Sequence, residues 1–326
     1  MAVADPLAAS SAVPAGEPPG GTAPTVVGRH DAFRRRLARL GWSFSAPALI
    51  VIAAVTIFPI VYSVIMSFSK VNVSGNGYSL NGLTLHNYSL VVNYGPWRYA
   101  LVFTVLYTVV TVSIELVVGT AFALVLERMT RGRGLLMAIL LIPWSLITVI
   151  SAELWSYMYD QQYGIIDAIF RAVGLGSPSI LGSAAPSIAA LCVADIWKTT
   201  PFVAIIVLAG LVMLPRDVYE AAEVDGASGW TTFWKITFPL LRPTIALAVL
   251  FRVLQAFGLF DLPFVLTHGG PGFATTPLAI LGYNVMFQDF LFGPGAAIAT
   301  TTALLVVIGC LLFLKVFRAQ VGSEIS

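Results

Sequence analysis

The sequence predicts an all-α, polytopic membrane protein with six transmembrane helices. Hydrophobic residues make up 58% of the 326 residues and charged residues only 10%, and the mean hydropathy is +0.87. Soluble domains carry about 25% charged residues. The apolar residues also gather into runs of the length, about 20 residues, that a helix needs to cross the hydrocarbon core. Since backbone groups inside lipid must be paired within the segment, we expect these runs to be helical.

The chain begins with two segments that do not span the membrane. Residues 1 to 28 are rich in Ala, Pro, Gly, Ser and Thr and have no positive charge before Arg29, so they predict a disordered tail rather than a signal peptide. Residues 29 to 44 form a basic segment, which is expected to lie against the cytoplasmic leaflet.

A single membrane domain is predicted over residues 45 to 317, followed by a C-terminal tail over 318 to 326. Its spans are placed near 45 to 68, 99 to 126, 134 to 158, 187 to 213, 243 to 266 and 295 to 317. The segments between them are rich in Gly, Pro, Asn and Ser and are expected to be loops.

Lys and Arg are distributed unevenly over the two sides of these spans. One side carries Arg29, Arg34, Arg35, Arg36, Arg39, Arg128, Arg131, Arg133, Arg216, Lys235, Arg242, Lys315 and Arg318. The other side carries Lys70, Arg98 and Arg171. Because positive charge accumulates on the cytoplasmic side of membrane proteins, both termini and the loop at 214 to 242 are predicted to be cytoplasmic, in a multi-pass protein of the plasma membrane.

The residue types exclude several classes of function. Cys192 and Cys310 are far apart within apolar runs, and the three histidines lie outside such runs, so a metal cluster is not expected. A GxxxxGK[ST] phosphate loop is absent from the sequence. We therefore expect no cofactor bound by this chain, no catalytic residues and no nucleic-acid partner, and any ATP hydrolysis must come from another chain.

The loop at 214 to 242 predicts two short helices. Asp217 is expected to cap the first, and Glu220 three residues on completes a pattern like a capping box. Gly226 permits a sharp turn, and Ser228 can cap the second helix.

The surface of the first helix is also informative. Ala221 and Ala222 give it a low relief that another protein can approach closely, and Pro239 is expected to end the second helix. On these residues alone, a plain amphipathic connector is the alternative interpretation.

Three long segments and this loop carry a resemblance to a known family. The sequence EAAEVDGA at 220 to 227, followed by FWKITFPLLRP, resembles the EAA loop of permease subunits of bacterial binding-protein-dependent ABC importers, and it is most similar to the MalF-like carbohydrate permeases. The matching segments elsewhere are LVLERMTRGRGLLMAILLIPWSL, ADIWKTTPFVAIIVLAGLVMLP and FDLPFVLTHGGPGFATTPLAILGYNVMF. The compact six-span form is similar to trehalose-importer permeases of actinobacteria.

The resemblance implies a transport subunit that moves a sugar by alternating access. Its implied partners are a second permease, two ATP-binding subunits that bind ATP and Mg, an extracellular solute-binding protein, the sugar and the lipid bilayer. It also implies a cytoplasmic coupling helix that docks into the ATPase. By position in the motif, the contacting residues are Glu220, Ala221, Ala222, Asp225 and Gly226.

Ionisable side chains inside spans are costly and therefore mark candidate functional positions. They are Glu115, Glu153, Asp195, Lys198, Arg252 and Asp261. Asp195 and Lys198 are spaced to neutralise each other on one helix face, and Arg252 is expected either to pair with Asp261 or to snorkel. An alternative function is an autonomous ion-coupled carrier in which carboxylates such as Glu115 relay protons, although no inverted repeat is evident in the sequence.

A sugar pathway is predicted along spans three, four and five. Pro201 and Pro143 are expected to bend their helices and free carbonyl groups, and the neighbouring aromatic rings suit the C–H face of a sugar. With the resemblance, these features predict a pathway lined by Trp144, Thr148, Asp195, Trp197, Thr199, Phe202, Gln255 and Asp261. Each aromatic ring here is also compatible with core packing. Asp195 and Thr199 stand where the maltose-type pattern has Asn and Gly, so the identity of the sugar stays open.

Overall fold

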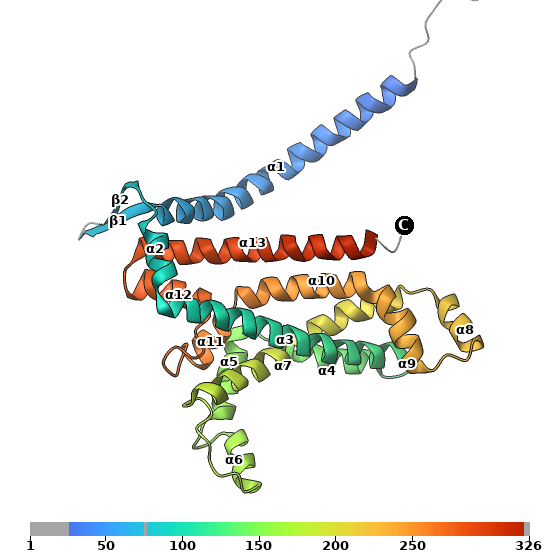
Figure 1. The fold of residues 1–326 in the computed structure, drawn as a ribbon. Helices are drawn as coiled ribbons and strands as arrows, with labels where there is room; N and C mark the ends of the chain where they lie inside the picture. The colour runs from blue at the N-terminus through green and yellow to red at the C-terminus, as the bar shows by residue number, and fades with distance from the viewer. Residues whose placement is uncertain (1–25, 75–76, 323–326) are drawn as a thin grey trace, which may run out of the picture. The chain divides into compact units, whose positions relative to one another are not determined.

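The computed structural model describes residues 26–74 and 77–322, and it places side chains over 37–74 and 77–315. Most of these residues are helical, which confirms the all-α prediction (Figure 1). The long helices are α1 (Val26–Ser67), α3 (Gly95–Arg128), α7 (Ala184–Val212), α10 (Phe238–Phe257) and α13 (Phe292–Gly322). The shorter elements are β1 (Ser69–Ser74), β2 (Gly77–Leu83), α2 (His86–Asn93), α4 (Arg133–Ser145), α5 (Thr148–Tyr159), α6 (Ile165–Ala172), α8 (Arg216–Val224), α9 (Gly229–Thr232), the π-helix η1 (Phe233–Thr237), α11 (Asp261–Leu266), α12 (Leu278–Tyr283) and the π-helix η2 (Asn284–Gln288).

Five helices within the described residues are long and apolar enough to cross a membrane, and the bent pair α4–α5 makes a sixth if it counts as one span. This agrees with the six predicted spans. Most of the tail predicted over 1 to 28 lies outside the described residues, as do residues 323–326. Helix α1 begins at Val26 and includes the basic segment, so that segment and the first span form one helix.

The chain divides into two units, Met1–Pro59 and Ile60–Ser326. In the first, the described residues are a single helix that contains Pro47. In the second, α3, α7, α10 and α13 run side by side, with α8 and α9 at one end of the bundle and the hairpin β1–β2, α11 and α12 at the other (Figure 1).

The core of the larger unit is built around α3 and α7. One apolar cluster joins these helices to α5 and α11 through residues such as Tyr107, Trp155 and Leu191. A second joins them to α10 through residues such as Leu126 and Val207. A third lies where α12 packs against α13. The polar residues of α3 and α7 described below fall, along the sequence, between the first two clusters.

Span three departs most from a simple helix. Helices α4 and α5 meet at an angle of 91°, and the residues between them, Leu146 and Ile147, have extended backbone. Pro143 cannot donate a backbone hydrogen bond within the last turn of α4, which weakens the helix directly before the break. The prediction of a bend near Pro143 is consistent with this geometry, although the break falls three residues later.

Span five was predicted to reach residue 266, but α10 ends at Phe257. Gly258 follows, and residues 261 to 266 form the separate helix α11. The low helix propensity of glycine accounts for the early end. The prediction that Pro239 ends the preceding helix is also wrong. The wide turn of η1 lies directly before Pro239, where the Phe238 amide donates to the Phe233 carbonyl, so the helix continues through the proline into α10.

A β-hairpin stands where the sequence suggested a loop. Strands β1 and β2 pair antiparallel from Lys70 and Asn81 to Ser74 and Gly77.

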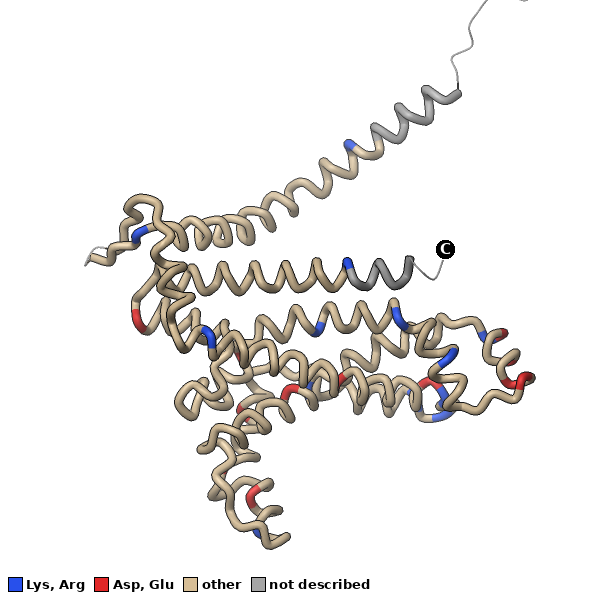
Figure 2. The backbone as a smooth tube through the Cα atoms, viewed as in Figure 1, with Lys and Arg blue, Asp and Glu red and all other residues tan. Residues whose placement is uncertain are grey.

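Charged residues gather at the end of the bundle that carries α8 and α9 (Figure 2). This distribution within Ile60–Ser326 matches the sidedness from which the orientation was predicted.

Candidate functional site

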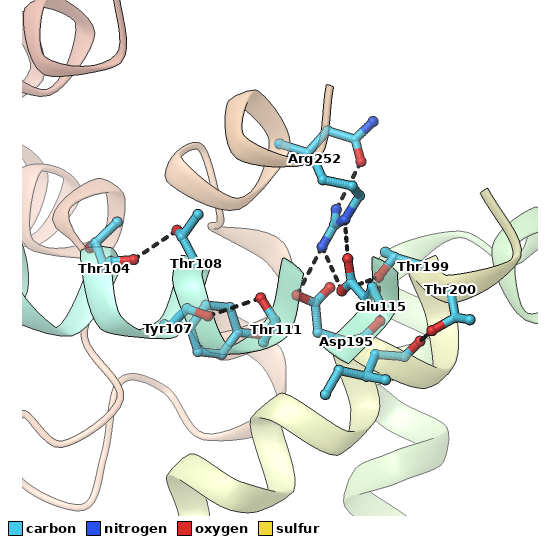
Figure 3. A network of polar contacts seen from close by, with 11 residues as sticks. Thr104, Tyr107, Thr108, Thr111, Glu115, Asp195, Thr199, Thr200 and Arg252 are labelled. Carbon is cyan, nitrogen blue, oxygen red and sulfur yellow. Dashed lines mark hydrogen bonds and ion pairs between the residues drawn. The ribbon is translucent and has the colours of Figure 1, made fainter. Parts of the chain in front are cut away.

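A cluster of charged side chains lies inside the bundle, at the level between the two apolar clusters of α3 and α7. It comprises Glu115 from α3, Asp195 and Thr199 from α7, and Arg252 from α10 (Figure 3). The exposed fractions are 0% for Glu115, 2% for Arg252 and 5% for Asp195. These residues come from three different helices, so the cluster ties the helices together at one level.

Arg252 is the centre of the cluster. Its Nε donates to Oε2 of Glu115 and its Nη2 donates to Oε1 of the same carboxylate at 2.9 Å, which makes a two-pronged contact. Nη2 also lies 3.3 Å from Oδ2 of Asp195, and Nη1 donates to Oε1 of Gln255 at 2.9 Å. The guanidinium is therefore fixed on three sides.

Thr199 completes the surroundings of Glu115. Its hydroxyl lies 2.7 Å from Oε1 of Glu115 and 2.6 Å from the backbone carbonyl of Asp195, and its one proton serves either acceptor. Burying a charge is expensive unless it is paired and hydrogen-bonded. The two carboxylates, the guanidinium and the hydroxyl meet this condition together.

Asp195 and Lys198 attract each other electrostatically but form no salt bridge within the described residues. Arg252, which was expected to pair with Asp261 or to snorkel, does neither. Arg252 pairs with Glu115 and Asp195 instead. Asp261 is exposed at the start of α11. Spacing along one helix suggested the first pair, but Asp195 lies closer to a guanidinium that a neighbouring helix supplies.

Lys198 has a different role. Its Nζ donates to the backbone carbonyl of Leu146 at 2.7 Å, next to the break between α4 and α5. The last carbonyls of a helix have no partner within it and carry partial negative charge. The ammonium group therefore satisfies the end of α4 and links it to α7.

An aromatic row runs across α4, α7 and α10. Trp144 stacks on Phe202 with ring centroids 5.9 Å apart, and Phe202 meets the edge of Phe251 at 6.2 Å. Trp144 is 46% exposed and Phe251 is 44% exposed. Gln255, four residues after Phe251 and on the same face of α10, is exposed as well. The row therefore offers an open apolar surface with an amide beside it.

The predicted pathway residues thus separate into two groups. Trp144, Phe202 and Gln255 are partly or well exposed, whereas Asp195 and Thr199 are buried in the charged cluster. Trp197 packs edge-on against Trp155, with centroids 5.6 Å apart, and Thr148 is the half-buried first residue of α5.

Two residues of this region did not enter the predicted pathway. Phe251 lies in a continuous apolar run, and its only sequence signal is its place next to Arg252. Glu115 was recognised as an ionisable residue in a span, but its partner is 137 residues away in the sequence.

The second candidate site is the loop that contains α8. The helix ends in a Schellman motif, in which the Ala227 amide donates to the Ala222 carbonyl and the Gly226 amide donates to the Glu223 carbonyl. Gly226 has a φ of +72°, which favours glycine, so the predicted turn is confirmed.

The residues of the motif lie on both the exposed and the buried side of α8. Glu220, Ala221, Asp225 and Gly226 are exposed, but Ala222 is buried against its own chain. The expectation that Ala222 forms part of the outer, low-relief surface is therefore wrong, because the α-helical repeat turns it inward.

Contacts on the inner side hold α8 in place. The hydroxyl of Tyr219 lies 3.2 Å from that of Thr237 in η1. Ser228 caps α9 as predicted, accepting from the Thr231 amide at 3.3 Å. Asp217 lies in the first turn of α8 and makes no capping hydrogen bond, since the helix begins two residues earlier than predicted, with Pro215 at the N-cap.

The comparisons with known proteins agree with this architecture. Residues 82–319 match the family described as binding-protein-dependent transport system inner membrane component. The chain is 38% identical over 286 residues to the trehalose/maltose transport system permease protein MalF of Thermococcus litoralis, covering 88% of this chain and 96% of the relative. It is 36% identical over 304 residues to the trehalose transport system permease protein SugA of Mycobacterium tuberculosis, covering 93% and 96%.

A solved structure shares the fold. The crystal structure of a bacterial ABC transporter involved in the import of the acidic polysaccharide alginate has a chain that superposes with a TM-score of 0.75 at 19% identity, covering 88% of this chain and 99% of that one.

Proposed function

The chain belongs to the family of inner membrane components of binding-protein-dependent transport systems, and on that basis we propose that it is the permease subunit of an ATP-driven importer that carries trehalose or a related di- or oligosaccharide. The observation that carries the proposal is the similarity, at 36 to 38% identity over most of the chain, to two permeases named for trehalose transport. The chain then moves solute without catalysing a covalent reaction of its own.

The coupling loop supplies the mechanical contact in this proposal. The exposed side of α8, with Glu220, Ala221, Asp225 and Gly226, docks on an ATP-binding subunit, and Ala222 anchors the helix to its own chain. The link from Tyr219 to η1 and the continuous helix from α9 to α10 pass the motion of the ATPase into the bundle. Movement of the bundle as packed helices alternates access between the two sides of the membrane.

The aromatic row supplies the surface for the sugar. Stacked rings suit the C–H face of a sugar, and polar groups beside them can meet its hydroxyls. Trp144, Phe202 and Phe251 provide the rings, and Gln255 provides the amide.

The remaining partners follow from the family. We infer a second permease, two ATP-binding subunits that hold ATP and Mg, and an extracellular solute-binding protein. The α8 end of the bundle then faces the cytoplasm, with both termini on the same side.

The buried cluster argues against an autonomous ion-coupled carrier. A carboxylate that relays protons has to exchange them with water, but Glu115 is fully buried and held by Arg252. The cluster therefore serves better as a structural tie than as a proton pathway.

Replacement of Glu220 by Arg together with Gly226 by Val tests the coupling. The charge reversal and the strained turn are expected to abolish ATP-dependent uptake of labelled trehalose by cells that express the whole importer, and to reduce co-purification of the ATP-binding subunit. Glu127→Arg is the matched control, because Glu127 is an exposed glutamate near the C-terminal end of α3 and lies outside α8. Normal uptake by the double variant would refute the assignment of α8 as the coupling helix.

A further inference from the structure

Gln255 is the exposed end of a buried network. Its side chain is exposed, whereas its partner Arg252 is 2% exposed and Glu115 is fully buried. Gln255 also shares a face of α10 with Phe251, which belongs to the aromatic row. The buried charges therefore reach the aromatic surface through one amide.

The orientation of that amide follows from chemistry. A guanidinium group has five N–H donors and no acceptor, so only the carbonyl oxygen of Gln255 can face it. Nη1 of Arg252 donates to that oxygen at 2.9 Å. The NH₂ group of Gln255 must then point away from Arg252, and its two N–H donors are offered to whatever lies beside the aromatic row.

Glu115 determines where the guanidinium lies. Its carboxylate occupies Nε and Nη2, which fixes the plane of the group and leaves Nη1 as the edge that meets Gln255. A carboxylate bound to both nitrogens holds an arginine far more tightly than a single contact. Arg252 in turn cannot rotate without losing Asp195.

We propose that Glu115 is a positioning residue that, through Arg252, holds the amide of Gln255 with its N–H donors toward the solute, so that this wall of the pathway selects for a hydrogen-bond acceptor on the cargo. The inference rests on the proposed function and deepens it. A hydroxyl or ring oxygen of a sugar accepts from the amide while the C–H face of the same sugar stacks on the rings. Cargo that has no oxygen at this point covers the two N–H donors of Gln255 without pairing them and is disfavoured.

The direct test removes the donor. Gln255→Glu keeps an oxygen for Arg252 but removes the outward N–H groups, and Gln255→Met removes both polar atoms. In proteoliposomes with the complete importer and its solute-binding protein, we expect either change to lower trehalose uptake per ATP hydrolysed about three- to tenfold, the range expected for one hydrogen bond. ATP hydrolysis stimulated by the loaded binding protein is expected to stay unchanged. Gln288→Glu, at an exposed glutamine of η2, is the matched control.

The positioning role is tested by Glu115→Gln, with Glu153→Gln as the control at an exposed glutamate of α5. Glu115→Gln is expected to lower uptake per ATP to the same degree as Gln255→Met, and the double variant is expected to be no worse than either single variant, since both act on one group. A merely structural role would lower uptake and ATP hydrolysis together and would add to Gln255→Met.

A second variant covers the case in which Glu115→Gln does not assemble. Arg252→Lys keeps a positive charge between the two carboxylates but cannot form the planar fork that reaches Gln255. It is expected to reproduce the loss of uptake per ATP. Normal uptake per ATP in Gln255→Glu, or in Arg252→Lys, overturns this inference alone, whereas failure of the wild-type importer to take up trehalose, maltose or a related oligosaccharide overturns the proposed function as well.

Discussion

Helices α7 and α13 are both long and apolar, yet they occupy opposite positions in the bundle. In the most apolar window of each, 61% of α7 is buried and only 11% of α13. Of these two windows, the more apolar is that of α13, the exposed helix, with a mean hydropathy of 2.5 against 1.7 for α7. Lipid solvates apolar side chains as well as a protein interior does, so apolar surface alone does not drive a helix inward. Charged groups do, and α7 carries Asp195 and Lys198 in its middle, whereas α13 has no charged residue before Lys315.

Loss of the central guanidinium gives the largest expected effect. Arg252→Met leaves Glu115 and Asp195 buried without a counter-charge, which is expected to lower the free energy of unfolding by about 3 to 5 kcal/mol. Unfolding by SDS titration in mixed micelles measures this. Arg98→Met, at an exposed arginine of α3, is expected to change stability by less than about 0.5 kcal/mol. An equal loss of unfolding free energy in the two variants would mean that the buried ion pairs of Arg252 contribute no more to stability than an exposed arginine does.

Removal of the link to the broken span comes next. Lys198→Met leaves the Leu146 carbonyl at the end of α4 without its charged donor, and we expect a loss of about 1.5 to 3 kcal/mol. The same titration measures it, with Lys315→Met on α13 as the control, because Lys315 is exposed near the end of its helix. An unchanged free energy of unfolding in Lys198→Met would show that packing alone holds the break between α4 and α5.

The contact between α3 and α7 is tested by adding a side chain to a glycine. A Cβ at Gly119 would lie 2.9 Å from Cγ1 of Val203 and 3.1 Å from the Ala204 amide nitrogen. Gly119→Leu is therefore expected to push the helices apart at a cost of about 1 to 3 kcal/mol. At Gly309 of α13 a Cβ meets nothing within 4 Å, so Gly309→Leu is expected to be neutral or slightly stabilising. Thermal unfolding of the two variants in the same detergent sharpens the comparison between the helices, and a similar loss for both would contradict it.

The smallest expected effect concerns two threonines. Thr199→Val removes a hydroxyl that meets Glu115, and we expect a loss of about 1 kcal/mol. In the described part of α13, the Thr301 hydroxyl donates to the Ala297 carbonyl of its own helix, so Thr301→Val is expected to change little. A double-mutant cycle of Thr199→Val with Glu115→Gln isolates the contact, and an additive result would show that the hydroxyl acts only on its own helix.

The sequence predicted the parts of the fold that depend on local chemistry. The membrane-length helices follow from the length of the apolar runs, the turn at Gly226 follows from the positive φ that glycine tolerates, and the cap at Ser228 follows from its hydroxyl. The continuation of the helix through Pro239 was not predictable, because it depends on a π-helical turn that no sequence rule indicates.

The candidate site was less predictable. Spacing within one helix suggested that Asp195 pairs with Lys198, but the observed partner is on α10, and which helices are neighbours is not encoded by any local pattern. The inward turn of Ala222 and the exposure of Gln255 likewise depend on what packs against each helix. The list of ionisable residues inside spans nevertheless contained every charged member of the cluster.

Reconstitution of the purified chain measures the central claim most directly. Proteoliposomes that contain the complete importer, its solute-binding protein and internal ATP are expected to concentrate labelled trehalose, and liposomes that contain this chain with its partner permease but without the ATP-binding subunits are expected to show none of that accumulation. Accumulation against a gradient in the absence of any ATP-hydrolysing subunit would contradict the account.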